Sequence, residues 1–204
     1  MSQNANLDPF SASAGDPLPC FHAWMDVARA SEPSDPEAMA LATATPAGAP
    51  SVRMVLLKET TADGFFVFYT NAESRKGEEL AANPRAALCL HWKSLGRQVR
   101  IEGPVSGVEA DRSDKYFHSR ARGSQLGAVA SQQSRPLASR GILEARQAEA
   151  IARYPGEIAR PEYWRGFAVF AEAIEFWQGR RDRLHDRIVY RRGKDAWQRT
   201  LLYP

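Results

Sequence analysis

The feature that most constrains the fold is a series of short β-forming segments between residues 38 and 108. Turn-forming sequences such as Pro46-Ala47-Gly48 and Ala62-Asp63-Gly64 separate the segments, as expected for antiparallel strands. Together with three similar segments near the C-terminus, this spacing predicts a β-barrel or a β-sandwich. The segments occupy residues 38–45, 51–58, 65–70, 86–92, 98–108, 167–177, 186–192 and 197–203.

Helical patterns surround these strands. The first begins at Asp16-Pro17-Leu18 and should end before Pro33. A second helix is predicted over residues 75–82, with Ser74 as its cap and Asn83-Pro84 as its stop. Three more helices are predicted over residues 109–120, 124–133 and 141–153. We therefore expect a mainly β fold of the α+β class, with a single domain over residues 16–204 and a flexible segment over residues 1–15.

Composition excludes several classes of protein. The chain has 204 residues, of which 44% are hydrophobic, enough for one sizeable core. It contains no run near the roughly 18 apolar residues of a membrane span, and residues 1–15 lack the features of a signal peptide, so we expect a cytoplasmic protein. Cys20 and Cys89 lie far apart and the four histidines are scattered, which predicts neither a disulfide nor a metal site.

The positive charge is unevenly distributed. Residues 1–50 hold one base against six acids, so the net charge of +3 corresponds to +8 over the rest of the chain. Arginine supplies 22 of the 27 bases, and its planar guanidinium suits bidentate binding of phosphate or carboxylate. A phosphorylated ligand, a nucleic acid and a solvated basic surface are the three interpretations of this pattern.

Two segments place cations beside structural boundaries. Arg53 and Lys58 bracket an apolar strand and face opposite sides of it, where they can serve two anions, two faces of one ligand, or solvent. Tyr69-Thr70 precedes a predicted helix start that carries Arg75 and Lys76. A helix N-terminus attracts phosphate, and cations there are unfavourable unless an anion is present. A phosphate site and a capped surface helix explain this second segment about equally well.

Polar side chains in two further regions can contact a ligand. Gln98 and Gln133-Ser134 offer amide and hydroxyl groups to the edge of a flat heterocycle, although such residues are often plain surface. Tyr116, Arg120 and Ser124 place a phenol, a guanidinium and a hydroxyl close together in sequence. This set can hold a second phosphate, and an amphipathic helix end explains it nearly as well.

The densest cluster of candidate residues follows residue 175. Trp177 offers an aromatic wall, and Arg183, His185 and Arg187 share one side if the segment is extended. An edge strand with scattered charge is the alternative. Three cationic or titratable groups beside a tryptophan favour a ligand site, with His185 as the histidine most suited to a functional role.

Taken in order, these segments resemble the pyridoxine/pyridoxamine 5'-phosphate oxidase family from about Asp16 to the C-terminus. Five motifs in the family's order make coincidence implausible. The resemblance implies a homodimeric FMN-binding split β-barrel with FMN at the subunit interface. The motifs are Arg53 to Lys58, Phe68 to Asn71 with Ser74-Arg75-Lys76, Tyr116 to Arg120, Ser139 to Glu144, and Phe176 to Gly179 with Arg183 to Arg187.

The resemblance also implies roles for individual residues. Those expected to bind FMN are Arg53, Met54, Val55, Leu56, Leu57, Lys58, Tyr69, Thr70, Arg75, Lys76, Gln98, Gln133, Ser134, Trp177 and Arg187. Those expected to bind substrate are Lys58, Tyr116, Arg120, Ser124, Arg183, Leu184 and His185. Among the latter, Arg183 and His185 are the expected catalytic residues, flanking the reacting carbon. The family's arginine and tyrosine that help to close over the substrate have no counterpart in residues 1–15.

The implied activity is oxidation of pyridoxine or pyridoxamine 5'-phosphate to pyridoxal 5'-phosphate. Hydride passes to FMN and O2 reoxidises the flavin to give H2O2, with NH3 released from the amine substrate. One alternative is a related split-barrel FMN oxidase that acts on another aromatic metabolite, such as a phenazine precursor. An alternative of another class is a nucleic-acid-binding β-barrel, which would need exposed aromatics and a longer basic stripe.

Overall fold

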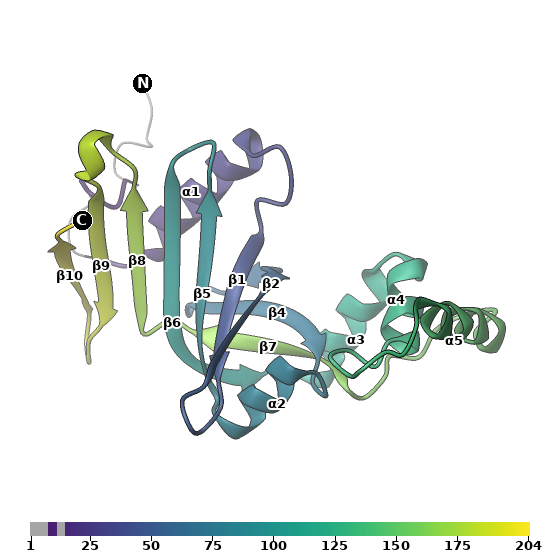
Figure 1. The fold of residues 1–204 in the computed structure, drawn as a ribbon. Coiled ribbons are helices and arrows are strands. Elements are labelled where there is room, and N and C mark those ends of the chain that lie inside the picture. Colours follow the sequence, from purple (N-terminus) through teal and green to yellow (C-terminus); the bar gives the residue numbers. More distant parts are fainter. Residues whose placement is uncertain (1–7, 12–14) are drawn as a thin grey trace.

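A computed structural model describes residues 8–11 and 15–204 of the chain. Ten strands form one curled antiparallel sheet with the order β10-β9-β8-β6-β5-β1-β2, from which β4, β7 and the short β3 branch (Figure 1). The strands are β1 Ala38–Ala44, β2 Pro50–Leu56, β3 Glu59–Thr60, β4 Phe65–Asn71, β5 Arg85–Trp92, β6 Arg97–Gly107, β7 Trp164–Phe170, β8 Ala173–Gln178, β9 Asp186–Arg192 and β10 Trp197–Leu202. The helices are α1 Leu18–Ser31, α2 Arg75–Ala82, α3 Ala110–Ser119, α4 Arg122–Ala130 and α5 Arg140–Arg153, with a 3-10 turn η2 at Arg181–Arg183.

The long strand β6 curls the sheet into a half-barrel. Its first half pairs with β8 and its last three residues, Val105 to Gly107, pair with β7. Gly103 lies where one partner replaces the other, and a Cβ at this position would come within 1.8 Å of the carbonyl oxygen of Phe170. Only glycine allows so close an approach of two backbones, and this contact lets the sheet turn.

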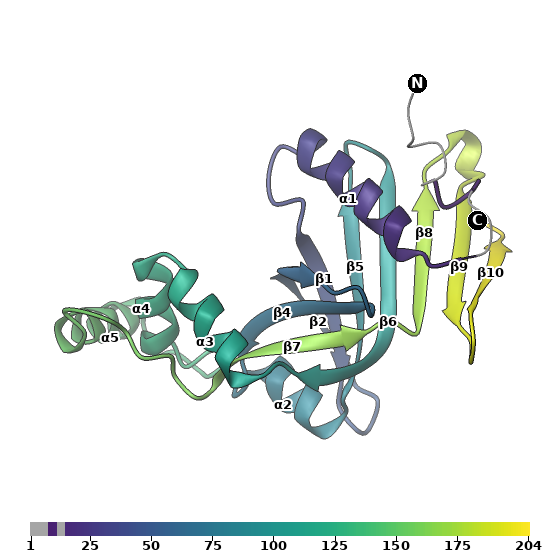
Figure 2. The same cartoon turned by 180° about the vertical axis from the view of Figure 1, so that it is seen from behind.

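The main core fills the curl of the sheet and is covered by α1. This helix buries residues at helical spacing, and Figure 2 shows it lying across one face of the strands. Phe21 packs edge-on against Phe66 with ring centroids 5.0 Å apart, and Trp24 packs against Phe176 at 5.3 Å. Strand β1 alternates buried and half-buried positions, as expected for a strand with one face in the core.

A second, smaller core holds the helices at one end of the molecule. Figure 1 shows α3, α4 and α5 together beyond β4 and β7, at the opposite end of the sheet from β10. The buried residues of this core come from the three helices, the segment after α5 and the start of β7, and are Phe117, Leu126, Ala130, Ala150, Ile158 and Trp164. This cluster is separate from the main core, so the helices form a distinct wall against which a ligand can bind.

An exposed apolar stripe runs along β2, the last strand of the sheet order. Val52, Met54 and Leu56 are 68%, 63% and 40% exposed. Contiguous apolar side chains on a terminal strand are typical of an interaction surface. The sequence suggested an apolar strand here but gave no sign that one face would lie open.

The predicted mainly β, α+β architecture is confirmed, with three local differences. Residues 167–177 form two strands instead of one, because the chain crosses at Ala171-Glu172 from a pairing with β4 to a pairing with β6 and β9. The helix predicted over residues 124–133 spans Arg122–Ala130. Ser74 precedes α2 but makes no capping hydrogen bond, because its hydroxyl donates to the carbonyl of Asn71 at 2.6 Å.

The predicted flexibility of residues 1–15 falls largely outside the described residues and stays a prediction. Pro9, in the described part of this segment, is held to the sheet by a hydrogen bond: the hydroxyl of Tyr190 donates to its carbonyl oxygen at 2.9 Å. Among the described helices, none has the length and apolar character needed to cross a bilayer.

Candidate functional site

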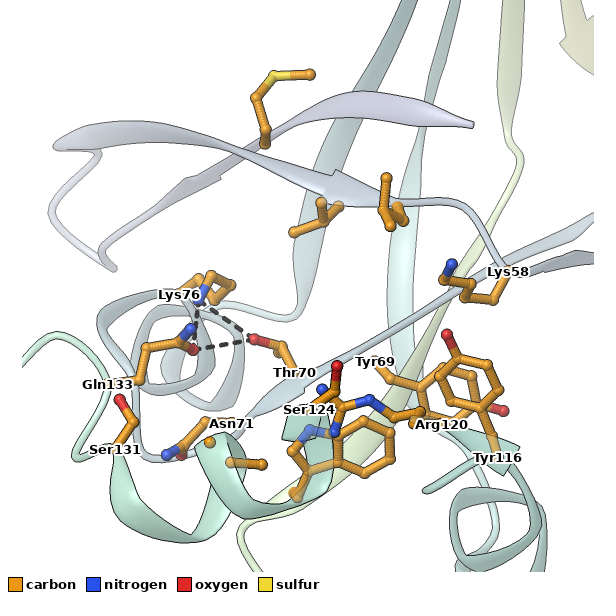
Figure 3. A pocket seen from close by; sticks show the side chains of 16 residues that line it. Lys58, Tyr69, Thr70, Asn71, Lys76, Tyr116, Arg120, Ser124, Ser131 and Gln133 are labelled. Carbon is orange, nitrogen blue, oxygen red and sulfur yellow. Dashed lines mark hydrogen bonds between the residues drawn. The ribbon is translucent and has the colours of Figure 1, made fainter. Parts of the chain in front are cut away.

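A cavity of about 620 Å³ lies between the sheet and the second core (Figure 3). It lies within the size range of sites for small ligands. Its walls come from β2, β4, α2, α3, α4 and the segment after α4, so residues far apart in sequence meet there. The lining residues are Met54, Val55, Leu56, Lys58, Tyr69, Thr70, Asn71, Lys76, Tyr116, Arg120, Ser124, Gly127, Ala128, Ser131, Gln133 and Trp164.

One end of the cavity is built around the ammonium of Lys76. This side chain is buried, and its Nζ donates to Thr70 Oγ1 at 3.2 Å, Ser74 Oγ at 3.1 Å and Gln133 Oε1 at 3.0 Å. Burial, assisted by the nearby Arg53 cation, lowers the pKa of Lys76 to about 8. No carboxylate of the described chain forms an ion pair with it. A buried cation with neutral partners provides a fitting site for a phosphate anion.

The other end of the cavity holds a second group of polar side chains. Figure 3 shows Lys58, Tyr116, Arg120 and Ser124 around it, with Tyr69 beside them. Nη1 of Arg120 is buried and has no hydrogen-bond partner in the described part of the chain, while burial lowers the pKa of this guanidinium. An unsatisfied buried donor calls for an acceptor, and a second anionic group fits this position.

Arg53 and Arg75, both expected to contact FMN, lie outside the cavity lining. The carboxylate of Glu79 accepts hydrogen bonds from both, with Arg53 Nη2 at 3.3 Å and Arg75 Nε at 2.9 Å. The hydroxyls of Ser51 and Thr43 also donate to this carboxylate, and these two hydrogen bonds, with a smaller effect of Arg75, lower the pKa of Glu79 to about 2. The terminal nitrogens of Arg53 are thus occupied by protein groups on β1, β2 and α2.

A second group of predicted residues lies elsewhere on the sheet. Gln98 on β6 is paired with Trp177 on β8, which is paired with Arg187 on β9. Directly opposed residues of antiparallel strands share a face, so the three form a row across the sheet. The ring of His185 lies 4.6 Å from that of Trp177. None of these residues lines the cavity, and Figure 1 places the turn between β8 and β9 at the opposite end of the sheet from α3, α4 and α5.

The turn that carries Arg183 is strained instead of extended. Asp182 and Arg183 have φ values of 57° and 60° within η2, so the predicted strand alternation of Arg183 with His185 is wrong. Leu184 follows with 69% of its surface exposed. The backbone N–H of Arg180 donates to Nδ1 of His185 at 3.1 Å, which leaves the proton of a neutral ring on Nε2. Backbone strain of this kind clusters at functional sites.

The remaining expected residues fall into two sets. Met54, Val55 and Leu56 line the cavity, whereas Leu57 is buried in the main core. Gln133 lines it, and the next residue, Ser134, is exposed with a φ of 72°. Sequence analysis missed Asn71, Ser131 and Trp164. Trp164 lies just before the stretch with β pattern, and no motif marked it.

The geometry defines a class of protein before any comparison of sequences. The half-barrel matches a pyridoxamine 5'-phosphate oxidase-related, FMN binding protein from Nostoc punctiforme with a TM-score of 0.75 at 16% identity, covering 94% of this chain and 100% of that one. The fold is that of the FMN-binding split barrels, and the cavity contains a buried cation, Lys76, that fits the phosphate of such a cofactor.

Sequence comparison identifies the family. Residues 27–154 match the family described as pyridoxamine 5'-phosphate oxidase, and residues 164–204 match the pyridoxine 5'-phosphate oxidase C-terminal dimerisation region. The chain therefore belongs to the pyridoxamine 5'-phosphate oxidase family. This confirms the predicted family, the split-barrel fold class and FMN as cofactor, and the dimerisation region supports a homodimer.

Individual relatives agree with this placement. The chain is 57% identical over 194 residues to the pyridoxine/pyridoxamine 5'-phosphate oxidase of Rhodospirillum rubrum, covering 93% of this chain and 96% of that one. It is 59% identical to the protein of the same name from Erythrobacter litoralis, covering 93% and 91%. PhzG from Burkholderia lata, solved with tetrahydrophenazine-1-carboxylic acid, is 31% identical with a TM-score of 0.89, covering 97% and 96%.

Proposed function

We propose that this chain oxidises pyridoxine 5'-phosphate or pyridoxamine 5'-phosphate to pyridoxal 5'-phosphate. Relatives of 52–59% identity carry the name of this activity. The observation that carries the proposal is one cavity with a cation at each end, Lys76 at one and Arg120 at the other, neither paired with a carboxylate of the described residues. Two anionic sites in one cavity suit a phosphorylated cofactor beside a phosphorylated substrate.

The Lys76 end fits the FMN phosphate. Its ammonium, the hydroxyl of Thr70 and the amide of Gln133 already converge on one point. FMN, when bound, supplies the two-electron acceptor, and O2 reoxidises it to give H2O2. Arg53 reaches the cofactor only if its hydrogen bonds to Thr43, Ser51 and Glu79 rearrange, so we propose a supporting role for it through the fixed geometry of β2. Arg75 donates only its Nε to Glu79, and its exposed side chain keeps the terminal nitrogens available for the phosphate.

The opposite end fits the substrate phosphate. Lys58 and Arg120 supply positive charge, and Tyr116 and Ser124 supply hydroxyl donors around the same space. Binding energy from this remote phosphate aligns the reacting carbon without taking part in the chemistry. Free pyridoxine lacks the phosphate and should use none of these contacts.

The second group of residues completes the site from the other subunit. Gln98, Trp177, His185 and Arg187 lie together but outside the cavity of their own chain, and Arg183 is held beside them on a strained, exposed turn. The dimerisation region includes β7 to β10 and thus most of this group. We propose that FMN lies between the two subunits, where Arg183 and the Nε2 proton of His185 position the alcohol or amine of the substrate.

PhzG supports the runner-up function, oxidation of a phenazine precursor. It was solved with a ligand that has no phosphate, and its overall structure is very similar to that of this chain. The phosphate end of the cavity argues against this alternative, because a ligand without a phosphate would not need Lys58, Tyr116, Arg120 and Ser124 together. A cytoplasmic location remains a prediction from the sequence.

Steady-state oxidation of two substrates tests the proposal. The purified protein should show flavin absorption bands and should have a kcat/KM for pyridoxine 5'-phosphate at least about 100-fold above that for pyridoxine, since charge-assisted phosphate contacts are worth about 3 kcal/mol or more. Equal values for the two substrates would exclude the phosphate site. A colourless protein that shifts DNA would instead support the nucleic-acid alternative.

A further inference from the structure

Three aromatic rings stack beneath the proposed substrate-phosphate site. The ring centroids of Tyr69 and Tyr116 are 4.2 Å apart, those of Tyr69 and Trp164 are 5.4 Å apart, and those of Tyr116 and Trp164 are 5.9 Å apart. All three pairs are close to parallel, with interplanar angles of 23°, 9° and 17°. Trp164 is only 6% exposed, so its ring is fixed by packing between the cavity and the second core.

This stack carries a cation at each side. The guanidinium carbon of Arg120 lies 4.8 Å from the ring centroid of Trp164, and Nζ of Lys58 lies 5.9 Å from that of Tyr116. Both distances fall within the range of cation–π attraction. The rings therefore set the separation of the two cations that the substrate phosphate must bridge.

Arg120 depends on these rings more than on hydrogen bonds. Within the described residues its guanidinium makes no ion pair and no side-chain hydrogen bond, and its Nη1 is buried without a partner. Its contacts are the faces of Trp164 at 4.8 Å and Phe117 at 5.8 Å. A flexible arginine with no hydrogen-bond partner keeps its orientation only through such packing.

We propose that Trp164 is a positioning residue for the substrate phosphate. Its indole holds the guanidinium of Arg120 and the phenol of Tyr116 in the arrangement that receives the phosphate. This inference rests on the proposed function. It predicts that Trp164 controls KM for phosphorylated substrates and leaves kcat and FMN affinity unchanged.

Two substitutions at this position test whether an aromatic ring is required or whether an apolar side chain of similar size is enough. Trp164→Phe keeps a ring below Arg120, and Trp164→Met keeps an apolar side chain without one. We expect Trp164→Met to raise KM for pyridoxine 5'-phosphate at least about tenfold, with kcat and the FMN Kd within about twofold of wild type, and Trp164→Phe to restore KM to within about threefold. The inhibition constant of inorganic phosphate should rise in parallel with KM.

A control and a double mutant make the test specific. Ile158→Ala loosens the same small core away from the cavity, and should lower the melting temperature without changing KM. In an Arg120→Lys background, Trp164→Met should raise KM little further, because the ring would have lost the guanidinium it holds. Unchanged KM in Trp164→Met, an equal rise in Ile158→Ala, or full additivity with Arg120→Lys would overturn the inference.

The same measurements distinguish an error in the role of Trp164 from an error in the proposed function. If wild-type protein with bound FMN does not turn over pyridoxine 5'-phosphate, the function itself is wrong. If wild type turns it over and Trp164→Met has the same KM, only the role of Trp164 is wrong. If Trp164→Met does not fold, Trp164→Phe and the double mutant Trp164→Phe/Arg120→Lys supply the same comparison of KM.

Discussion

Single residues in this protein show how burial prepares a cation for an anion. The pKa of Lys76 falls to about 8 chiefly because its ammonium is buried, and its hydrogen-bond partners are all neutral. The charged form is therefore disfavoured until a phosphate arrives. Binding of an anion should raise the pKa again and should take up a proton when the pH is above about 8.

This coupling predicts a pH dependence of cofactor binding. Because the free protein loses the Lys76 proton as the pH rises through about 8, the Kd for FMN should increase about tenfold between pH 7 and pH 9. Fluorescence titration of the cofactor-free protein measures this. Riboflavin, which has the same ring without the phosphate, should show no such change, and neither should Lys76→Met. A pH-independent Kd for FMN in wild type would show that Lys76 does not bind the FMN phosphate.

The same shift affects the stability of the cofactor-free protein with the opposite sign. A lysine whose pKa is lowered by folding makes the folded state less stable below that pKa than above it. The cost that Lys76 imposes should therefore diminish as the pH rises from about 8 towards the ordinary value of 10.5.

At the scale of elements, a buried carboxylate ties three of them together. Glu79 on α2 accepts hydrogen bonds from Ser51 on β2, Thr43 on β1 and two arginines, and the contacts with Ser51, Thr43 and Arg75 lower its pKa to about 2. A carboxylate with a lowered pKa stabilises the fold above its ordinary pKa, and this contribution is lost as the pH falls from about 4.5 towards 2.

Glu79→Gln should reveal this contribution directly. We expect a loss of about 1–3 kcal/mol in the free energy of unfolding at pH 7. The difference from wild type should be smaller at pH 3, because Glu79 is already protonated in the unfolded state there while it stays largely charged in the folded state. Urea denaturation at the two pH values measures both. The neighbouring Glu78→Gln is the control, since Glu78 is half exposed and pairs with Arg135 at the surface. A constant difference at both pH values would assign the effect to packing alone.

The elements themselves were largely predictable from local patterns. Helix α2 begins and ends where its flanking residues indicated, and most strands match the segments of β-forming residues. The break at Ala171-Glu172 was not predictable, because a single charged residue such as Glu172 is compatible with one continuous strand and only the change of strand partner reveals the break. Trp164 was missed for a related reason: its role comes from stacking with residues on α3 and β4.

At the scale of the whole molecule, the expected site divides into two parts within one chain. The cavity brings together Lys58, Thr70, Lys76, Tyr116, Arg120, Ser124 and Gln133, which the family resemblance had assigned to cofactor and substrate. The row of Gln98, Trp177 and Arg187, with His185 beside it, lies away from them. Local pattern in a sequence carries no information on which chain supplies each part, so this division emerged only from the fold.

Hybrid dimers test the central claim most directly, that each active site combines the cavity of one subunit with the sheet row and turn of the other. Arg120→Ala and Arg183→Ala should each abolish most activity as homodimers. Co-expressed in equal amounts, they should recover about a quarter of the wild-type sites, because half of the dimers are hybrids and each hybrid has one intact site. If the hybrids isolated by differential tags have no more activity than either parent, the two groups act within one chain and the account is contradicted.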